Sequence, residues 1–204
     1  LALERKAPLG AVFCLLPEYL GATMRQYGFM LRGLQGVAGR LAEKGIRFFL
    51  LQGEPGEEIP RFIAERGVSC LVTDFNPLRI KREWDCQIAE RTIVPFEVVD
   101  AHNIVPCHVA SPKREFSAAT FRPKIRTALR EFLTDFEPLR KHPVPWEGDA
   151  EPVDWLRLLQ ELPVDRSVGE ALWLEPGERA ARRAVIDFLE NRLASRFLAR
   201  NDPG

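Results

Sequence analysis

The segment TDFNPLRIKREW, residues 73–84, places an acid, an aromatic ring, an amide and a proline directly after the apolar run VSCLV. Asp74, Phe75 and Asn76 stand where a buried strand is expected to end, and Pro77 precedes a basic stretch that contains Trp84. A simple turn from strand to helix needs only a capping residue and a glycine. The segment is therefore a candidate ligand site, provided that a strand positions it.

A second aspartate occupies the equivalent place in a later apolar run. Asp74 ends VSCLVTD and Asp100 ends VPFEVVD. In open α/β sheets, ligands bind in the crevice outside the carboxyl ends of the strands. Each aspartate can equally cap the helix or turn that follows it. The pattern predicts where a site would lie, and it does not specify the ligand.

Common catalytic motifs are absent from the sequence, which contains no HExxH, GxSxG, GxxxxGK[ST] or GxGxxG. His102, Cys107 and His108 fall within seven positions, but their spacing fits no common zinc pattern and favours ordinary loop residues. The turn GEPGE, residues 53–57, has two interpretations. It is either a glycine-rich turn or a helix N-terminus that presents backbone N–H groups to an anion.

Apolar runs and amphipathic stretches alternate along the first 130 residues. Strands are expected at 10–16, 46–51, 68–74 and 94–100, because short apolar runs rich in β-branched and aromatic residues are typical of strands buried on both faces. Helices are expected at 24–43, after GEPGE, and at about 78–91. This order predicts an α/β fold with a Rossmann-like, doubly wound parallel sheet and right-handed crossovers.

The remainder of the chain has a different character. Residues 133–172 are rich in proline and charge, which predicts an irregular surface linker with one short helix around 155–162. A terminal helix is expected after Glu175 and Pro176, with Val185, Leu189, Leu193 and Phe197 spaced as an apolar ladder. The predicted organisation is an α/β domain at 1–132, a linker at 133–172 and a helical segment at 173–204.

Composition excludes several classes of protein. The 204 residues are 46% hydrophobic and 28% charged, with a formal net charge of zero, so there is no general case for nucleic-acid binding by this domain. No apolar run approaches the roughly 18 residues of a membrane span, and no signal peptide is recognisable. The four cysteines form no CxxC pair, which favours a reduced, cytoplasmic protein.

Several long segments resemble class II cyclobutane pyrimidine dimer DNA photolyases. The likeness is strongest in VTDFNPLRIKREW and in VPFEVVDAHNIVPCHVASPKREFSAATFRPKI, and it extends to residues 24–57. The last 30 residues resemble the helix that leads into the flavin-binding catalytic domain of this family. The resemblance therefore spans residues 9–204, nearly the whole chain.

The resemblance implies a light-dependent repair function that is divided between two domains. In this family the N-terminal α/β domain can hold an antenna chromophore, a deazaflavin in several members. It passes excitation energy to reduced FAD in a C-terminal helical domain, and FAD donates an electron that splits the thymine dimer. An acid, a ring and an amide suit a planar chromophore with polar edges, because Phe75 can stack while Asp74 and Asn76 orient its edge.

The resemblance also implies roles for the turn DAHN, residues 100–103, where the chain is expected to leave the sheet. The expected antenna site consists of the strand-end residues together with this turn: Asp74, Phe75, Asn76, Asp100, His102 and Asn103. The alternative is structural, with Asp74 as a cap and with Phe75 and Trp84 as anchors of the helix on the sheet. Arg122 and Lys124 are expected to fix the interdomain crossing rather than to contact DNA.

Two departures from the family pattern shape the functional prediction. The chain starts after the family's first strand and ends before the segment that binds FAD and flips damaged bases, so we expect the isolated chain to be inactive. UV-damaged DNA would be bound through the absent C-terminal domain, and the exposed terminal helix would favour self-association. The alternative is a stand-alone, non-enzymatic module that binds a nucleotide or flavin-like ligand or docks a partner.

Overall fold

A computed structural model describes residues 2–148 and 152–194 of the chain and confirms the predicted α/β class. The chain forms two compact units, one from residues 1–5 and 51–140, the other from 6–50 and 141–204. The strands pair as two two-stranded sheets, β1 with β2 and β3 with β4. That a further strand of the family precedes this chain stays a prediction.

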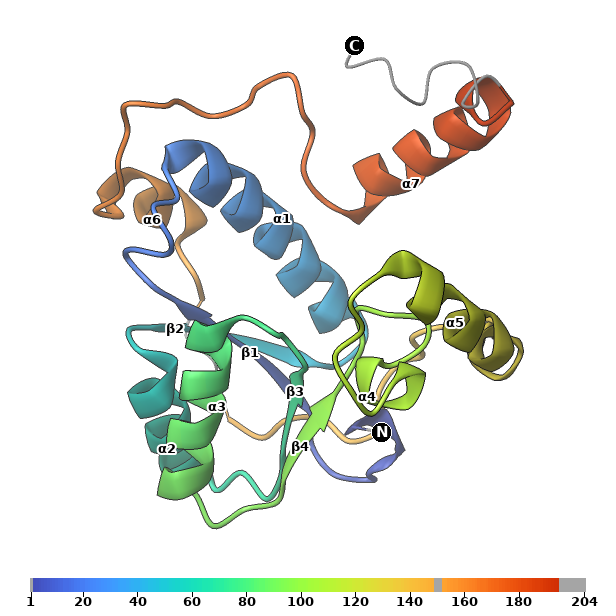
Figure 1. Cartoon of the computed structure of the whole chain (residues 1–204). Coiled ribbons are helices and arrows are strands. Elements are labelled where there is room, and N and C mark those ends of the chain that lie inside the picture. The colour runs from blue at the N-terminus through green and yellow to red at the C-terminus, as the bar shows by residue number, and fades with distance from the viewer. Residues whose placement is uncertain (1, 149–151, 195–204) are drawn as a thin grey trace. The chain divides into compact units, whose positions relative to one another are not determined.

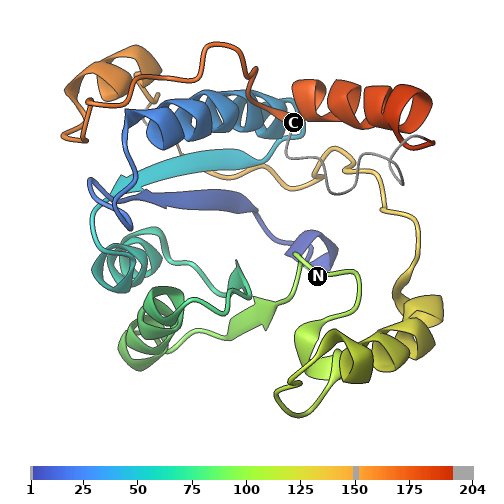
Figure 2. The same cartoon turned by 45° about the horizontal axis from the view of Figure 1, so that its top comes forward.

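Strand β1 (Gly10–Leu15), helix α1 (Met24–Glu43) and strand β2 (Arg47–Gln52) follow one another as the sequence pattern predicts. Thr23 and Gln26 form a capping box at the start of α1, which explains why the helix begins at Met24. Helix α1 covers one face of the β1–β2 sheet (Figure 2). The core cluster of this unit joins strand β1 to helix α1 and contains Leu15, Met24, Tyr27, Leu31, Leu159 and Leu162.

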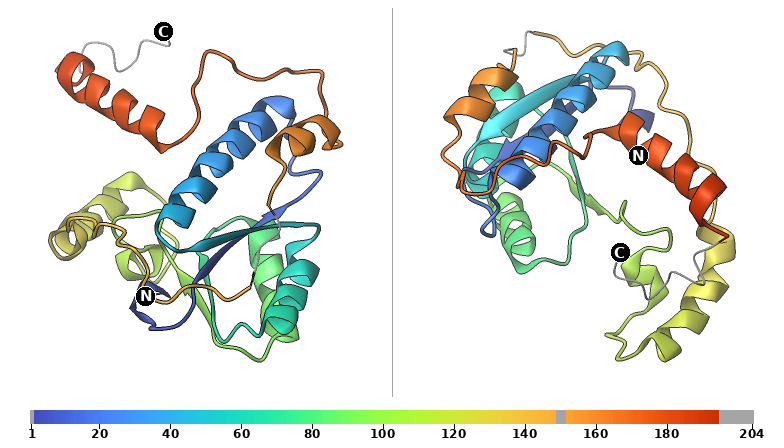
Figure 3. Two further views of the ribbon diagram at one scale, coloured as in Figure 1. Left: turned by 180° about the vertical axis from the view of Figure 1, so that it is seen from behind. Right: turned by 90° about the horizontal axis from the view of Figure 1, so that it is seen from above.

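The predicted linker contributes to that core and is not only a surface connection. Its short helix α6 (Trp155–Glu161) lies beside α1, as Figure 3 shows, and buries Leu159. The Arg166 guanidinium donates to the carbonyls of Leu159, Gln160 and Leu162 at 2.7–3.2 Å, which satisfies the free carbonyl groups at the end of α6. Side-chain bonds of this kind cannot be read from the proline-rich composition of the segment.

Further along, the linker is fastened to α1 by an ion pair. Glu170 accepts two hydrogen bonds from Arg32, at 2.7 and 3.0 Å, and the bond from Arg32 holds the Glu170 pKa below its ordinary value. Glu170 lies against Gly28, where a β-carbon would come within 2.7 Å of the glutamate side chain. A glycine at position 28 therefore gives the linker room to approach the helix.

The other unit contains helix α2 (Pro55–Arg66), strand β3 (Leu71–Asp74), helix α3 (Arg79–Arg91) and strand β4 (Phe96–Val99). Strands β3 and β4 are parallel, and α2 packs against α3 (Figure 1). Phe62 and Ile63 of α2 are buried. The expectation of strands buried on both faces was wrong for β4, where Val98 and Val99 are 47% and 37% exposed. Strands β3 and β4 are both edge strands, because their sheet has only two strands.

Two helices that the sequence pattern did not reveal complete this unit. Helices α4 (Cys107–Ala110) and α5 (Ala118–Phe132) pack against each other, and the short 3-10 helix η1 (Ala2–Glu4) lies near the N-terminus. Arg5, just after η1, forms an ion pair with Glu97 of β4. Within the described ranges, no helix is long and apolar enough to cross a membrane.

The predicted terminal helix begins after Gly177 and changes geometry partway. Helix α7 (Glu178–Asp187) continues into a π-helical turn, η2 (Phe188–Arg192). Val185, Leu189 and Leu193 are 45–56% exposed, as the predicted apolar ladder requires. Phe197, the last member of the ladder, lies outside the described residues.

Candidate ligand site at the carboxyl ends of strands β3 and β4

Parallel pairing brings the two predicted strand-end aspartates to one edge of the β3–β4 sheet. Asp74 lies opposite Val99 in the register, and the Phe75 N–H donates to the Val99 carbonyl at 2.7 Å. Asp100 therefore leaves its strand beside Phe75. This confirms the expected shared edge, although the two carboxylates have different surroundings.

Asp74 is the less constrained of the two. Its side chain is exposed, and among the described residues no hydrogen bond or ion pair holds its carboxylate. Helix α3 begins after Leu78 without any side-chain capping bond, so the alternative in which Asp74 caps this helix is wrong. Phe75 beside it is half-buried. An uncommitted carboxylate next to a partly exposed ring can still contact a ligand.

Asp100, in contrast, is committed to the turn that follows it. Its carboxylate accepts from the Cys107 N–H at 2.8 Å, from the Asn103 N–H at 3.2 Å and from the Asn103 amide nitrogen at 3.0 and 3.2 Å. Partial burial of Asp100 opposes its ionisation, but the bonds from Cys107 and Asn103 outweigh burial and lower its pKa. Asp100 therefore organises the DAHN turn and the start of α4.

The predicted amides likewise have structural partners. The Asn76 side-chain oxygen accepts from the Leu78 N–H at 3.0 Å, an Asx-turn bond that orients the entry to α3. The Asn103 amide is held by Asp100 and lies 3.4 Å from the Cys107 sulfur. Neither amide is a free loop group, so removal of either one changes the local structure as well as any ligand contact.

His102 and Cys107 complete the neighbourhood of the DAHN turn. His102 is exposed, and burial together with the bond to Asp100 raises the pKa of the Cys107 thiol, which makes it a poor nucleophile at neutral pH. No group of three His, Cys, Asp or Glu side chains is placed to hold a metal ion in the part of the chain that the structure describes. The chemistry available at this edge is therefore hydrogen bonding and stacking.

The GEPGE turn at the start of α2 carries its own negative charge. Glu54 accepts from the Trp84 indole N–H at 3.1 Å, and Glu57 and Glu58 occupy the first turn of the helix. These carboxylates already complement the positive end of the helix dipole, which argues against an anion site there. Trp84 thereby ties α3 to the start of α2, and its expected role as an anchor on the sheet stays a prediction.

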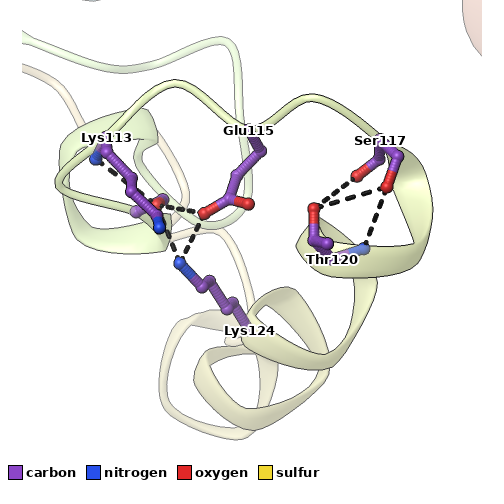
Figure 4. Close-up of polar contacts among 6 residues, drawn as sticks. Lys113, Glu115, Ser117, Thr120 and Lys124 are labelled. Atoms are coloured by element: carbon purple, nitrogen blue, oxygen red, sulfur yellow. Dashed lines mark hydrogen bonds and ion pairs between the residues drawn. The ribbon is translucent and has the colours of Figure 1, made fainter.

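Lys124 is bonded to neighbours in its own unit, and its expected role at the interdomain crossing stays a prediction. Figure 4 shows its amino group directed at Glu115, and it also donates to the Ser111 hydroxyl at 3.0 Å. Glu115 additionally accepts from Ser111 at 2.8 Å. These bonds, with that from Lys124 the largest influence, lower the Glu115 pKa to about 2. The cluster joins α5 to the loop after α4.

Comparison with known proteins identifies the family of this chain. The family model of DNA photolyase matches residues 1–145, and the chain belongs to that family. It is 46% identical to the deoxyribodipyrimidine photo-lyase of Potorous tridactylus, covering 100% of this chain and 38% of that protein. It is 40% identical to the protein of the same name from Arabidopsis thaliana, covering 100% of this chain and 43% of the relative.

More distant relatives agree with this assignment. The deoxyribodipyrimidine photo-lyase of Methanothermobacter thermautotrophicus is 30% identical over 97% of this chain and 44% of its own length. A cryptochrome structure from Synechocystis sp. PCC6803 superposes with a TM-score of 0.68 at 13% identity, over 97% of this chain and 43% of that chain, which supports the fold alone. The chain thus spans about two-fifths of the length of the relatives that it matches.

Proposed function

We propose that this chain supplies the N-terminal, antenna-chromophore domain of a light-dependent DNA repair enzyme that splits cyclobutane pyrimidine dimers. The observation that carries the proposal is the family match over residues 1–145, together with 40–46% identity to two deoxyribodipyrimidine photo-lyases over the whole chain. The class II assignment rests on the VTDFNPLRIKREW and DAHN segments. Within this proposal, residues 1–132 form the α/β domain, 133–172 the linker and 173–204 the lead into the catalytic domain.

The proposed enzyme divides its work between this chain and the rest of a longer parent protein. The relatives continue well beyond the matched region, and the proposal assigns FAD and UV-damaged DNA to that further part. Reduced FAD would supply the electron that splits the dimer. This chain would hold the antenna and would be inactive by itself. The zero net charge of this chain agrees with a domain that does not itself bind DNA.

The antenna site of the proposal lies at the carboxyl ends of β3 and β4, with a deazaflavin as the candidate ligand. The unpartnered Asp74 carboxylate and the half-buried Phe75 ring support it, because they can bond to the edge of a planar chromophore and stack on its face. Asp100, Asn76 and Asn103 would shape this wall through the bonds described above. His102 is exposed and would close the site from the DAHN turn.

A repair assay tests the proposed activity. The full-length gene product with reduced FAD is expected to remove thymine dimers from an oligonucleotide under blue light, and the 204-residue chain under the same conditions is not. Dark reactions and protein-free reactions serve as controls. A full-length product without light-dependent dimer loss would overturn the repair function, and dimer loss with the isolated chain would overturn the proposed division between domains.

Two further properties belong to the same proposal. The exposed apolar residues Val185, Leu189 and Leu193 would promote self-association of the isolated chain, because monomers rarely tolerate large apolar patches. A cytoplasmic location is supported by the four cysteines, none of which forms a disulfide bond.

A further inference from the structure

A pocket of about 440 Å³ lies in the unit formed by residues 6–50 and 141–204, whereas the strand ends that carry the proposed antenna site belong to the other unit. The end of α1 and the start of β2 form one wall, and the linker forms the other. Pockets that bind small molecules commonly measure about 300–1,000 Å³ and combine apolar walls with a few polar groups. The pocket falls within this range.

Three aromatic rings contribute to the lining of this pocket. Phe48 and Trp155 form a tilted pair with ring centroids 6.0 Å apart, and Trp146 also faces the pocket. Trp146 is held by an edge-on contact with Phe49 at 5.2 Å. Packed rings of this kind are rigid surfaces on which a planar molecule can stack with little loss of side-chain freedom.

Arg47 supplies the charge of the pocket. One of its terminal nitrogens donates to the Gly148 carbonyl at 3.2 Å, and among the described residues no carboxylate lies within ion-pairing distance of the guanidinium. A guanidinium has five N–H groups, so donors remain for a carboxylate or phosphate. Among the described residues that line the pocket, Arg47 is the one that carries a charge.

The nearby C-terminal end of α1 does not cancel this charge. Exposed carbonyls at a helix C-terminus repel anions. Here the carbonyls of Arg40, Leu41 and Ala42 accept from backbone N–H groups of residues 44–46, and the Lys44 carbonyl accepts from the His142 N–H at 2.7 Å. Because these carbonyls are already bonded, fewer of them remain to repel an acidic group that approaches Arg47.

We propose that this pocket is a second ligand site, which takes a small planar aromatic molecule bearing an acidic group. The ring stacks on Trp155 and Trp146, and the acid pairs with Arg47. This proposal does not depend on the proposed repair function, because it is argued from the pocket lining alone and none of the lining residues belongs to the proposed antenna site.

The test uses the 204-residue chain and a matched pair of probes, 1-naphthoate and 1-naphthamide, which differ mainly in charge. The chain has four tryptophans, at positions 84, 146, 155 and 173, whose indole N–H signals can be followed separately by NMR after ¹⁵N labelling. Naphthoate is expected to shift the signals of Trp146 and Trp155 and to leave those of Trp84 and Trp173 in place. Naphthamide is expected to bind about tenfold more weakly, since it lacks the charge-assisted bond.

Substitutions then assign the charge to one residue. Arg47→Gln keeps a donor for the Gly148 carbonyl and is expected to weaken naphthoate binding about tenfold, with naphthamide binding unchanged. Arg25→Gln is the matched control, because Arg25 also donates to a single backbone carbonyl, that of Gly169, and does not line the pocket.

Equal binding of acid and amide, or no shift at Trp146 and Trp155 at millimolar naphthoate, would overturn the proposal. Equal shifts at Trp173 would do the same, because they would indicate general adsorption to apolar surface. If Arg47→Gln fails to fold, the comparison of the two probes on the unmodified chain decides the matter alone.

Discussion

Replacement of Asp100 by alanine separates its structural role from the ligand role proposed for Asp74. Asp100→Ala removes the acceptor for three donors, the Cys107 N–H, the Asn103 N–H and the Asn103 amide. These donors lie near the surface and can be rehydrated, so the cost should resemble loss of a helix cap, about 1–2 kcal/mol. Asp74→Ala is the matched control and should stay within about 0.5 kcal/mol of wild type.

Two measurements test this difference. Urea unfolding gives the change in the free energy of unfolding, and hydrogen exchange at the Cys107 amide reports the local effect. Asp100→Ala should speed exchange at Cys107 about tenfold for each 1.4 kcal/mol lost, whereas Asp74→Ala should leave it unchanged. Equal destabilisation by the two substitutions would refute the assignment of different roles to the two aspartates.

The pH dependence of the same variant provides an independent check. Hydrogen bonds lower the Asp100 pKa below its ordinary value of 3.8. Its contribution to stability is therefore complete well above pH 3.8 and is lost as the pH falls through the lower folded-state pKa. The difference between wild type and Asp100→Ala should be full at pH 7 and should shrink below about pH 4. A difference that grows in acid would contradict this account.

Three further expectations concern other parts of the chain. Hydrogen bonds lower the pKa of Glu115 to about 2 from an ordinary 4.5, so its contribution to the free energy of unfolding should be lost as the pH falls from 4.5 to 2. Glu115→Gln should remove this loss from the free energies that urea unfolding gives over the same pH range. Gly28→Ala should lower the free energy of unfolding by about 1 kcal/mol by displacing Glu170, whereas Gly36→Ala in the same helix, with open space around it, should raise it by about 0.5–1 kcal/mol. Asn76→Ala should lower the melting temperature, with a cost of about 1 kcal/mol, because Asn76 bonds to the entry of α3.

Hydrophobic periodicity predicted helices α1, α2 and α3 and the four strands, and it missed helices α4 and α5. Helix α1 runs from Met24 to Glu43 as expected, because its apolar stripe and capping residues are local signals. Helix α5 was missed because it contains Pro123 and buries no residue, although Ser117 accepts from the Thr120 N–H at its start. Strands β3 and β4 are shorter than their apolar runs, because pairing decides where a ladder begins and ends.

For the candidate site, the sequence predicted location better than role. Both aspartates reach the same sheet edge, which follows from parallel strands alone. The sequence did not show which aspartate would be held by structural hydrogen bonds. That depends on how the DAHN turn folds back and places the Cys107 N–H against Asp100. The hydrogen bonds of Glu170 and Arg166 could not be predicted from the sequence either. Glu170 bonds to Arg32, which is distant along the chain, and Arg166 bonds to carbonyls that a local turn brings close to it.

Chromophore binding by the full-length parent tests the central claim most directly. A deazaflavin titration followed by fluorescence, with a thermal melt beside it, would compare wild type with Asp74→Asn. We expect Asp74→Asn to bind deazaflavin about tenfold more weakly, with an unchanged melting temperature. In the proposed site the Asp74 carboxylate bonds to the ligand, and among the described residues no hydrogen bond or ion pair holds it. Unchanged deazaflavin affinity in this variant would contradict the placement of the antenna site at the carboxyl ends of β3 and β4.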